Sequence, residues 1–116
     1  MREIEFRGKT SNGEWVYGGY IQSEQVICPQ TASVKIFIDP ETVAQYTERK
    51  DKNGVKIFRN DIVKFSNKDI AVICWFKDSW QFDFLWGFAP IGNVDDVSIE
   101  VIGNIHDNSE LLEVRA

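Results

Sequence analysis

Apolar and polar residues alternate with a period of two along much of the chain, and this alternation predicts β-strands. It is clear over residues 4–7, 14–17, 33–38 and 80–86, where one face of each predicted strand is apolar. A continuous apolar run over residues 70–76 is typical of a strand that is covered on both faces. No segment sustains a helical period over three turns, so the pattern predicts an all-β protein.

Two Asn-Gly pairs interrupt this pattern. Asn12-Gly13 and Asn53-Gly54 each separate two β-compatible runs, and Asn-Gly is the strongest short-range signal for a hairpin. At Asn12-Gly13 we expect a type I′ turn, because both residues tolerate positive φ. We also expect left-handed backbone at Asn60, directly before the next apolar run.

The two predicted hairpins align with each other at an offset of 41 residues. The alignment matches Lys9 with Lys50 and Val16 with Ile57. Duplication of a hairpin would explain this match, and so would turn chemistry and β alternation that the two segments share by chance. The course of the chain after each hairpin separates the two explanations.

Composition bounds the size and the compartment. The 116 residues suffice for one domain, or for one small barrel with an extension. Cys28 and Cys74 lie in apolar runs, as free buried thiols of a reducing compartment do. The first residues contain no apolar segment of signal-peptide length, and no run approaches the length of a membrane span. We therefore expect a cytoplasmic protein.

Charge is unevenly distributed along the chain. The net charge of −5 argues against a protein whose whole surface binds nucleic acid. Residues 49–64 are nevertheless basic, and one functional hypothesis is that this hairpin binds nucleic acid. The alternative is an ordinary hairpin whose charges are simply solvated. The basic residues of this stretch are Arg49, Lys50, Lys52, Lys56, Arg59 and Lys64.

Aromatic residues give a second functional hypothesis. Four Trp and eight Phe are many for this length, and most are expected to fill a β core. Trp15, Tyr17 and Tyr20 place more aromatic surface on the N-terminal hairpin than a hairpin alone can bury. They either complete the core or anchor a symmetric interface between copies of the chain.

Residues for catalysis or metal binding do not converge in the sequence. The single histidine, His106, follows the last predicted strand, and both cysteines lie in apolar surroundings that blunt a thiol. Neither CxxC nor HxxxH occurs, and the Asp95-Asp96 pair lacks the alternating ligands of a calcium loop. We therefore expect no catalytic residues, no metal and no cofactor.

Three segments resemble the YopX family of small phage and prophage proteins. They are EIEFRGKTSNGEWVYG, IDPETVAQYTERKDKNGVKIFRNDIV and EVIGNIHDNSELL, which begin at residues 3, 38 and 100. The resemblance implies a mainly β protein whose C-terminal part is a small SH3-like barrel, and a phage or prophage protein that acts in the bacterial cytoplasm. It carries over no activity or cofactor. At Ala44, Glu48 and Asn60 this chain departs from small Gly positions of the family.

Together these observations predict an N-terminal β-hairpin sheet over residues 1–47 and a five-stranded SH3-like barrel over residues 48–116. Residues 87–97, rich in Gly, Pro and Asn, are expected to form a loop. The barrel strands are expected near 55–58, 61–66, 69–76, 80–86 and 99–105. The predicted core comprises Phe6, Val16, Ile36, Ile57, Ile62, Val72, Cys74, Phe82, Phe84, Val101 and Ile102.

For function, the sequence favours a non-enzymatic accessory protein that binds another protein or a second copy of itself as a homo-oligomer. The alternative is a small nucleic-acid-binding barrel that uses the basic residues of the stretch 49–64. No membrane partner is expected.

Overall fold

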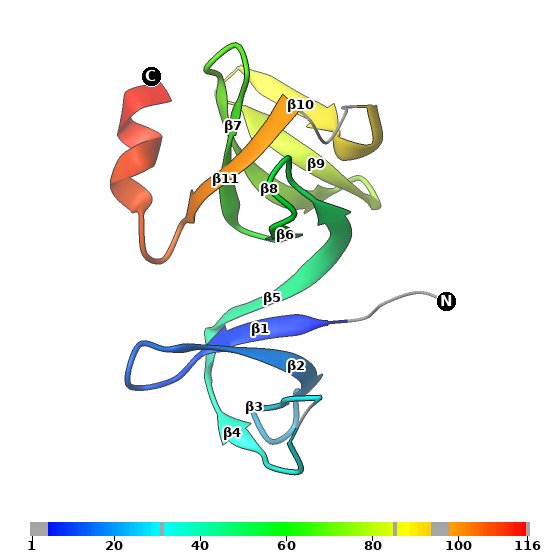
Figure 1. Cartoon of the computed structure of the whole chain (residues 1–116), viewed down its shortest axis with the longest axis vertical. Helices are drawn as coiled ribbons and strands as arrows, with labels where there is room; N and C mark the ends of the chain where they lie inside the picture. The colour runs from blue at the N-terminus through cyan, green and yellow to red at the C-terminus, as the bar shows by residue number, and fades with distance from the viewer. Residues whose placement is uncertain (1–4, 31, 85, 94–97, 116) are drawn as a thin grey trace. The chain divides into compact units, whose positions relative to one another are not determined.

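A computed structural model describes most of the chain, namely residues 5–30, 32–84, 86–93 and 98–115. The chain divides into two compact units, Met1–Glu48 and Arg49–Ala116. Both are built from β-strands (Figure 1), and the described residues contain no α-helix. The prediction of an all-β protein is confirmed.

The first unit is a meander of four strands, with a fifth beside the first strand. Its strands are β1 (Phe6–Lys9), β2 (Trp15–Ile21), β3 (Val26–Cys28), β4 (Ile36–Phe37) and β5 (Asp39–Lys50). They pair in the order β4-β3-β2-β1-β5, and the end of β5 continues to β6 (Lys56–Phe58), which makes six strands in this sheet. Gly18 permits the close approach of β3, because a Cβ at this position would collide with the carbonyl oxygen of Cys28.

β5 begins at Asp39, although Asp39-Pro40 predicts a turn there. Proline is tolerated at the start of a strand, where its missing N–H is least needed. The pairing of β1 with β5 shifts register between Arg7 and Lys9. The Thr42 hydroxyl bridges this irregularity, since its Oγ1 accepts a hydrogen bond from the Lys9 N–H at 2.8 Å and donates one to the Asp39 carbonyl at 2.6 Å.

The second unit contains a five-stranded sheet in the order β10-β9-β8-β7-β11. Its strands are β7 (Asp61–Phe65), β8 (Ile70–Phe76), β9 (Ser79–Phe84), β10 (Gly87–Pro90) and β11 (Ile99–Asn104). A 3-10 turn, η1 (Ile91–Asn93), follows β10, and a 3-10 segment, η3 (Ser109–Arg115), follows β11.

The two units trace the same path. In each, four consecutive strands form a meander and the fifth lies beside the first, so β1 to β5 correspond to β7 to β11. The offset of 41 residues instead aligns β1 and β2 with β5 and β6. After those hairpins the chain diverges: β2 runs on to pair with β3, whereas β6 ends after three residues and β7 begins in the other sheet. The duplication hypothesis at that offset is therefore wrong.

Three hairpin loops share one backbone geometry. Each loop has five residues, and the N–H of its fourth residue donates a hydrogen bond to the carbonyl oxygen of its first residue. The N–H of the first residue donates to the carbonyl oxygen of the fifth, and all these bonds are between 2.8 and 3.0 Å long. The fourth residue is left-handed in each loop, with φ of 84°, 80° and 76°. This is a type I turn followed by a left-handed residue, and Asn12 is not left-handed as a type I′ turn would require. The loops are Thr10–Glu14, Asp51–Val55 and Phe65–Asp69.

The β8–β9 connection has type I′ character. Its two central residues, Lys77 and Asp78, have φ of 52° and 60°, as this tight turn requires. Asn60 is left-handed as predicted, with φ of 72°, and Glu48 has φ of 71°. Glu48 and Asn60 are two of the positions at which the family resemblance places glycine, the residue that adopts this conformation without steric cost.

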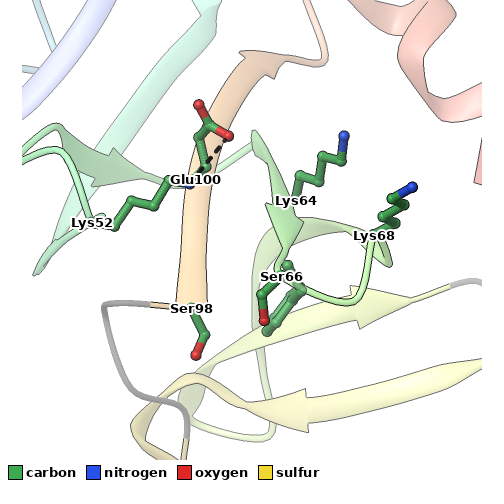
Figure 2. Close-up of a pocket in the computed structure, with 7 residues that line it drawn as sticks. Lys52, Lys64, Ser66, Lys68, Ser98 and Glu100 are labelled. Carbon is green, nitrogen blue, oxygen red and sulfur yellow. Dashed lines mark ion pairs between the residues drawn. The ribbon is translucent and has the colours of Figure 1, made fainter.

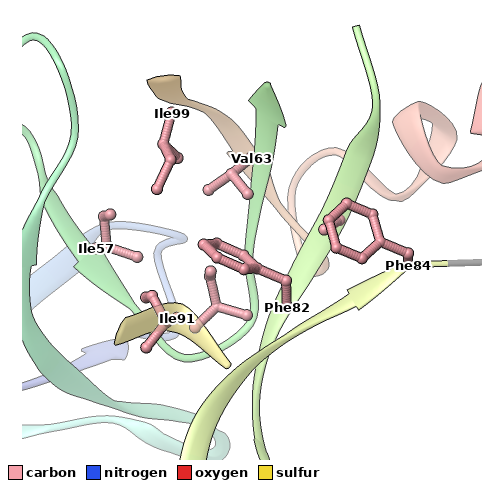
Figure 3. Close-up of a cluster of buried hydrophobic side chains, with 8 residues drawn as sticks. Ile57, Val63, Phe82, Phe84, Ile91 and Ile99 are labelled. Carbon is pink, nitrogen blue, oxygen red and sulfur yellow. The ribbon is translucent and has the colours of Figure 1, made fainter. Parts of the chain in front are cut away.

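The core of the second unit lies on one face of its sheet (Figure 3). Val63, Ala71, Ile73 and Phe82 are fully buried there, and the Phe65 ring packs edge-on against Phe82 with centroids 4.9 Å apart. The remaining buried members of this cluster are Ile57, Phe84, Ile91 and Ile99. Burial of several aliphatic and aromatic side chains, each contributing on the order of 2 kcal/mol, explains how so short a segment holds its sheet.

Several sequence predictions about this unit need correction. Residues 87–90, part of the predicted loop, form the edge strand β10, and β6 pairs with β5 instead of joining the five-stranded sheet. The pairings among the described strands do not close into a barrel.

The predicted core is also only partly right. Ile57, Ile62, Phe82 and Phe84 are buried, and the other seven predicted residues are half-buried. In β8 the fully buried side chains are Ala71 and Ile73, the opposite face from the predicted Val72 and Cys74.

Candidate functional site

The basic residues of stretch 49–64 differ in their surroundings. Arg49 donates from Nη1 to the carbonyl oxygen of Ile91 at 3.0 Å, which gives it a structural role. Lys56 is half-buried, whereas Lys50 and Arg59 are exposed. The structure brings only Lys52 and Lys64 of this set into a common pocket.

Asp51, an acidic residue within this stretch, holds the hairpin in place. Its carboxylate is 5% exposed and accepts three backbone N–H bonds of 2.9 Å. Oδ1 accepts from Asn53 and Val55 within the loop, and Oδ2 accepts from Val101 on β11. The Lys52 N–H also donates to the Ile99 carbonyl at 3.0 Å. These bonds fix the hairpin against β11 and so position the Lys52 side chain.

The pocket that contains Lys52 and Lys64 is rich in lysine. It has a volume of about 230 Å³ and is open to solvent. Figure 2 shows Lys64 and Lys68 extending in the same direction from β7 and from the loop after it. We call this site the lysine pocket; its lining residues are Lys52, Lys64, Phe65, Ser66, Lys68, Ser98 and Glu100.

The charges of the lysine pocket are only partly balanced. Lys52 Nζ lies 3.8 Å from Glu100 Oε1, and the two side chains are 47% and 42% exposed. An ion pair this exposed contributes little to stability, at about 0–1 kcal/mol. Within the part of the chain that the structure describes, the ammonium groups of Lys64 and Lys68 make no hydrogen bond or ion pair. Lys68 was outside the predicted set, since it follows the basic stretch and belongs to a loop without an Asn-Gly signal.

The predicted aromatic residues of the first unit are partly engaged. Trp15 is half-buried, with the Arg7 guanidinium 4.7 Å from the centroid of its ring. Tyr20 is also half-buried, and the centroid of its ring lies 5.9 Å from that of Phe6. Tyr17 is 46% exposed. Of the three, Tyr17 has the most surface available to a partner.

More exposed aromatic surface is found on the second unit. Phe76 of β8 and Phe88 of β10 point to the face of the sheet opposite the core and stack across β9, with centroids 4.3 Å apart and an interplanar angle of 22°. They are 37% and 48% exposed. The Lys77 ammonium lies 5.4 Å from the centroid of Phe76. We call Phe76 and Phe88 the aromatic pair; the sequence hypothesis missed it because the β10 segment is predicted to be a loop.

Of the side chains considered for catalysis, Cys74 is a free, half-buried thiol and His106 lies in a turn. Burial, with a smaller contribution from Asp83, raises the pKa of the Cys74 thiol above its ordinary value, which lowers its reactivity at neutral pH. The Asp61 carboxylate is 1% exposed and accepts a bond of 2.8 Å from the Phe58 N–H. His106 is exposed, in a turn where its N–H donates to Asn104 Oδ1 at 3.0 Å.

Metal-ligating groups do not gather either. The described residues hold no cluster of three or more His, Cys, Asp or Glu side chains that could bind a metal ion. The Asp95-Asp96 pair considered for calcium lies outside the described residues. In the described part of the chain, no helix is long and apolar enough to cross a membrane.

Fold and site together define a small all-β protein of two antiparallel sheet units, with a lysine-rich pocket and an exposed aromatic pair on the second unit. A family profile described as YopX protein matches residues 1–113, nearly the whole chain. The chain therefore belongs to the YopX protein family. A comparison with curated proteins finds no match.

Proposed function

We propose that this YopX-family chain is a non-enzymatic accessory protein of phage or prophage origin that acts in the bacterial cytoplasm by binding protein, first of all a second copy of itself. The observation that carries this proposal is the aromatic pair, in which two large rings stack while both stay exposed. Exposed aromatic side chains of this kind are enriched at the centres of protein interfaces.

A second copy is the occupant that the edge of the sheet favours. Phe88 belongs to β10, an edge strand of four residues whose outer backbone groups have no partner strand among those described. Antiparallel pairing of two β10 strands about a two-fold axis would satisfy those groups and bring the two aromatic pairs together. Pro90, which lacks an N–H, limits such pairing to the first residues of β10.

We also propose an SH3-like architecture for the second unit. The strand order β10-β9-β8-β7-β11 supports it, as does the 3-10 turn η1 between the fourth and fifth strands of this sheet.

Light scattering and native mass spectrometry over a range of protein concentrations test the self-association. The Phe76→Ser/Phe88→Ser double variant should be monomeric at concentrations where the wild type is dimeric. Tyr17→Ser, which removes an equally exposed aromatic from the first unit, should leave the dimer intact. A wild-type chain that stays monomeric at the highest concentration overturns the proposal, as does an unchanged dimer in the double variant.

Nucleic-acid binding is the second candidate. It is favoured by the ammonium groups of Lys64 and Lys68, which make no ion pair or hydrogen bond among the residues that the structure describes. Against it, Arg49 donates to a carbonyl oxygen and Lys56 is half-buried, so two of the six basic residues are less available to a phosphate backbone. A salt titration against single- and double-stranded probes tests this candidate. Failure to bind at low salt removes it.

A further inference from the structure

The walls of the lysine pocket are held by backbone hydrogen bonds between segments far apart in the sequence. The Ser66 N–H donates to the Ser98 carbonyl at 3.1 Å, and the Lys52 N–H donates to the Ile99 carbonyl at 3.0 Å. The loop after β7 is closed by the bond from the Lys68 N–H to the Phe65 carbonyl at 2.8 Å. The pocket is thus built on fixed backbone, and only its side chains need to rearrange for a ligand.

Lys68 occupies a backbone position that disfavours lysine. Its φ is 76°, and the two other loops of the same geometry have glycine there, Gly13 and Gly54. A left-handed conformation is unfavourable for residues with a Cβ, so lysine at this position lowers stability relative to glycine. Strain at a position that faces a pocket points to a functional role for its side chain.

The pocket carries surplus positive charge in an acidic protein. It places three ammonium groups beside one carboxylate, in a chain whose net charge is −5. Glu100 Oε1 forms its ion pair with Lys52 Nζ, at 3.8 Å, although Glu100 also lies opposite Lys64 in the pairing of β11 with β7. In the described part of the chain Lys64 and Lys68 make no ion pair. The two ammonium groups of Lys64 and Lys68 match the charge of a phosphate monoester, which is between −1.5 and −2 at neutral pH.

We propose that the lysine pocket binds the phosphate group of a small phosphate monoester, such as a mononucleotide. Lys64 and Lys68 supply the charge, and the hydroxyl groups of Ser66 and Ser98 can donate hydrogen bonds to phosphate oxygens. The volume of about 230 Å³ lies below the roughly 300–1,000 Å³ of sites that enclose drug-sized ligands. The pocket therefore takes the phosphate and leaves the rest of the ligand outside.

Glu100 opposes phosphate binding. Its carboxylate repels an incoming anion and competes for Lys52, the third ammonium of the pocket. Because the pair is exposed and weak, Lys52 can leave Glu100 and turn to a bound phosphate. The site therefore predicts opposite effects of removing a lysine and removing the carboxylate.

An NMR titration of the full-length ¹⁵N-labelled protein tests the proposal, with inorganic phosphate and with a 5′-mononucleotide as separate ligands. Both should shift the amide signals of residues 64–68 and of Ser98 at millimolar concentrations. Lys64→Gln and Lys68→Gly should each weaken binding by about fivefold or more, the loss of one charge contact of about 1 kcal/mol. Glu100→Gln should tighten it by a similar factor.

Lys77→Gly provides the matched control. Lys77 is also exposed and left-handed, but it lies in the β8–β9 turn and does not line the pocket. Both Gly variants lose one charge and relieve one left-handed lysine, so both should raise the melting temperature. Only Lys68→Gly should lose phosphate affinity.

Four outcomes would overturn the proposal. They are an absence of shifts at residues 64–68 with both ligands, an equal loss of affinity in Lys77→Gly, no gain in Glu100→Gln, and binding confined to the nucleic-acid probes of the salt titration proposed above. The last outcome would support the nucleic-acid candidate instead. None of these results depends on the aromatic pair, so the oligomeric state tests self-association independently.

Discussion

Replacement of Asp51 by asparagine tests the physical account of the second unit most directly. The carboxylate is buried and accepts backbone N–H bonds from Asn53, Val55 and Val101, each 2.9 Å long. Asparagine keeps the size of the side chain and removes its charge. One of its two polar atoms becomes an NH₂ donor, so it cannot accept all three hydrogen bonds in the same geometry.

The expected cost follows from these three bonds. With the amide oxygen toward the loop, the bonds from Asn53 and Val55 persist but lose charge assistance, at roughly 0.5–1 kcal/mol each. The amide NH₂ then faces the Val101 N–H, and this donor loses its partner in a partly buried site, which costs about 1–3 kcal/mol. We therefore expect Asp51→Asn to lower the free energy of unfolding of the second unit by about 2–5 kcal/mol.

Urea unfolding together with amide hydrogen exchange measures this effect, because exchange reports the Val101 N–H separately. Thr10→Ala is the control, since Thr10 occupies the same place in the first loop. Its Oγ1 accepts from Asn12 and Glu14 over longer, exposed distances of 3.2 and 3.3 Å. We expect a cost there of about 0.5–1 kcal/mol. If Asp51→Asn costs no more than Thr10→Ala and Val101 stays protected, the assigned role of Asp51 is wrong.

Two further predictions concern other parts of the chain. Gly18→Ala should destabilise the first unit by about 1–3 kcal/mol in thermal unfolding, because the new Cβ would collide with the Cys28 carbonyl. Gly19→Ala is the control: its Cβ would have nothing within 4 Å, so the stability should change by no more than about 0.5 kcal/mol. In a Cys28→Ser background, iodoacetamide should alkylate Cys74 more slowly in the folded protein than in urea, because the raised pKa keeps the thiol protonated. Since the folded state then holds this proton more tightly than the unfolded state, Cys74 should also make stability fall as pH rises from the ordinary thiol pKa to the raised pKa of the folded state. Equal alkylation rates in the two states would contradict this.

The sequence locates hairpins well where glycine is needed and poorly where it is not. Asn12-Gly13 and Asn53-Gly54 mark two loops because their fourth residue is left-handed. The third loop of the same geometry has Lys68 in that place, and propensity alone gives no signal for it. Ser66-Asn67 does repeat Ser11-Asn12 at the same loop positions, which is the pattern that could have found it.

Face assignment in β8 fails for a different reason. A continuous apolar run has no period, so nothing in residues 70–76 tells Ala71 and Ile73 from Val72 and Cys74. The pairing of β8 with β9 decides the face, because it sets Ile73 opposite Phe82. The lysine pocket is beyond sequence reasoning for a related reason: Lys52, Lys64 and Glu100 come from three segments that only tertiary structure brings together.

The placement of the fifth strand beside the first has a consequence for synthesis on the ribosome. In the first unit the outer edge of β1 is fully paired only after Gln45 has been synthesised, because Gln45 pairs with Phe6. In the second unit the outer edge of β7 is fully paired only after Asn104, the partner of Asp61, has been synthesised. Each nascent sheet therefore grows as a local meander and is completed only when its last strand emerges. A pause in translation before residue 99 would leave one edge of β7 exposed and able to pair with another chain.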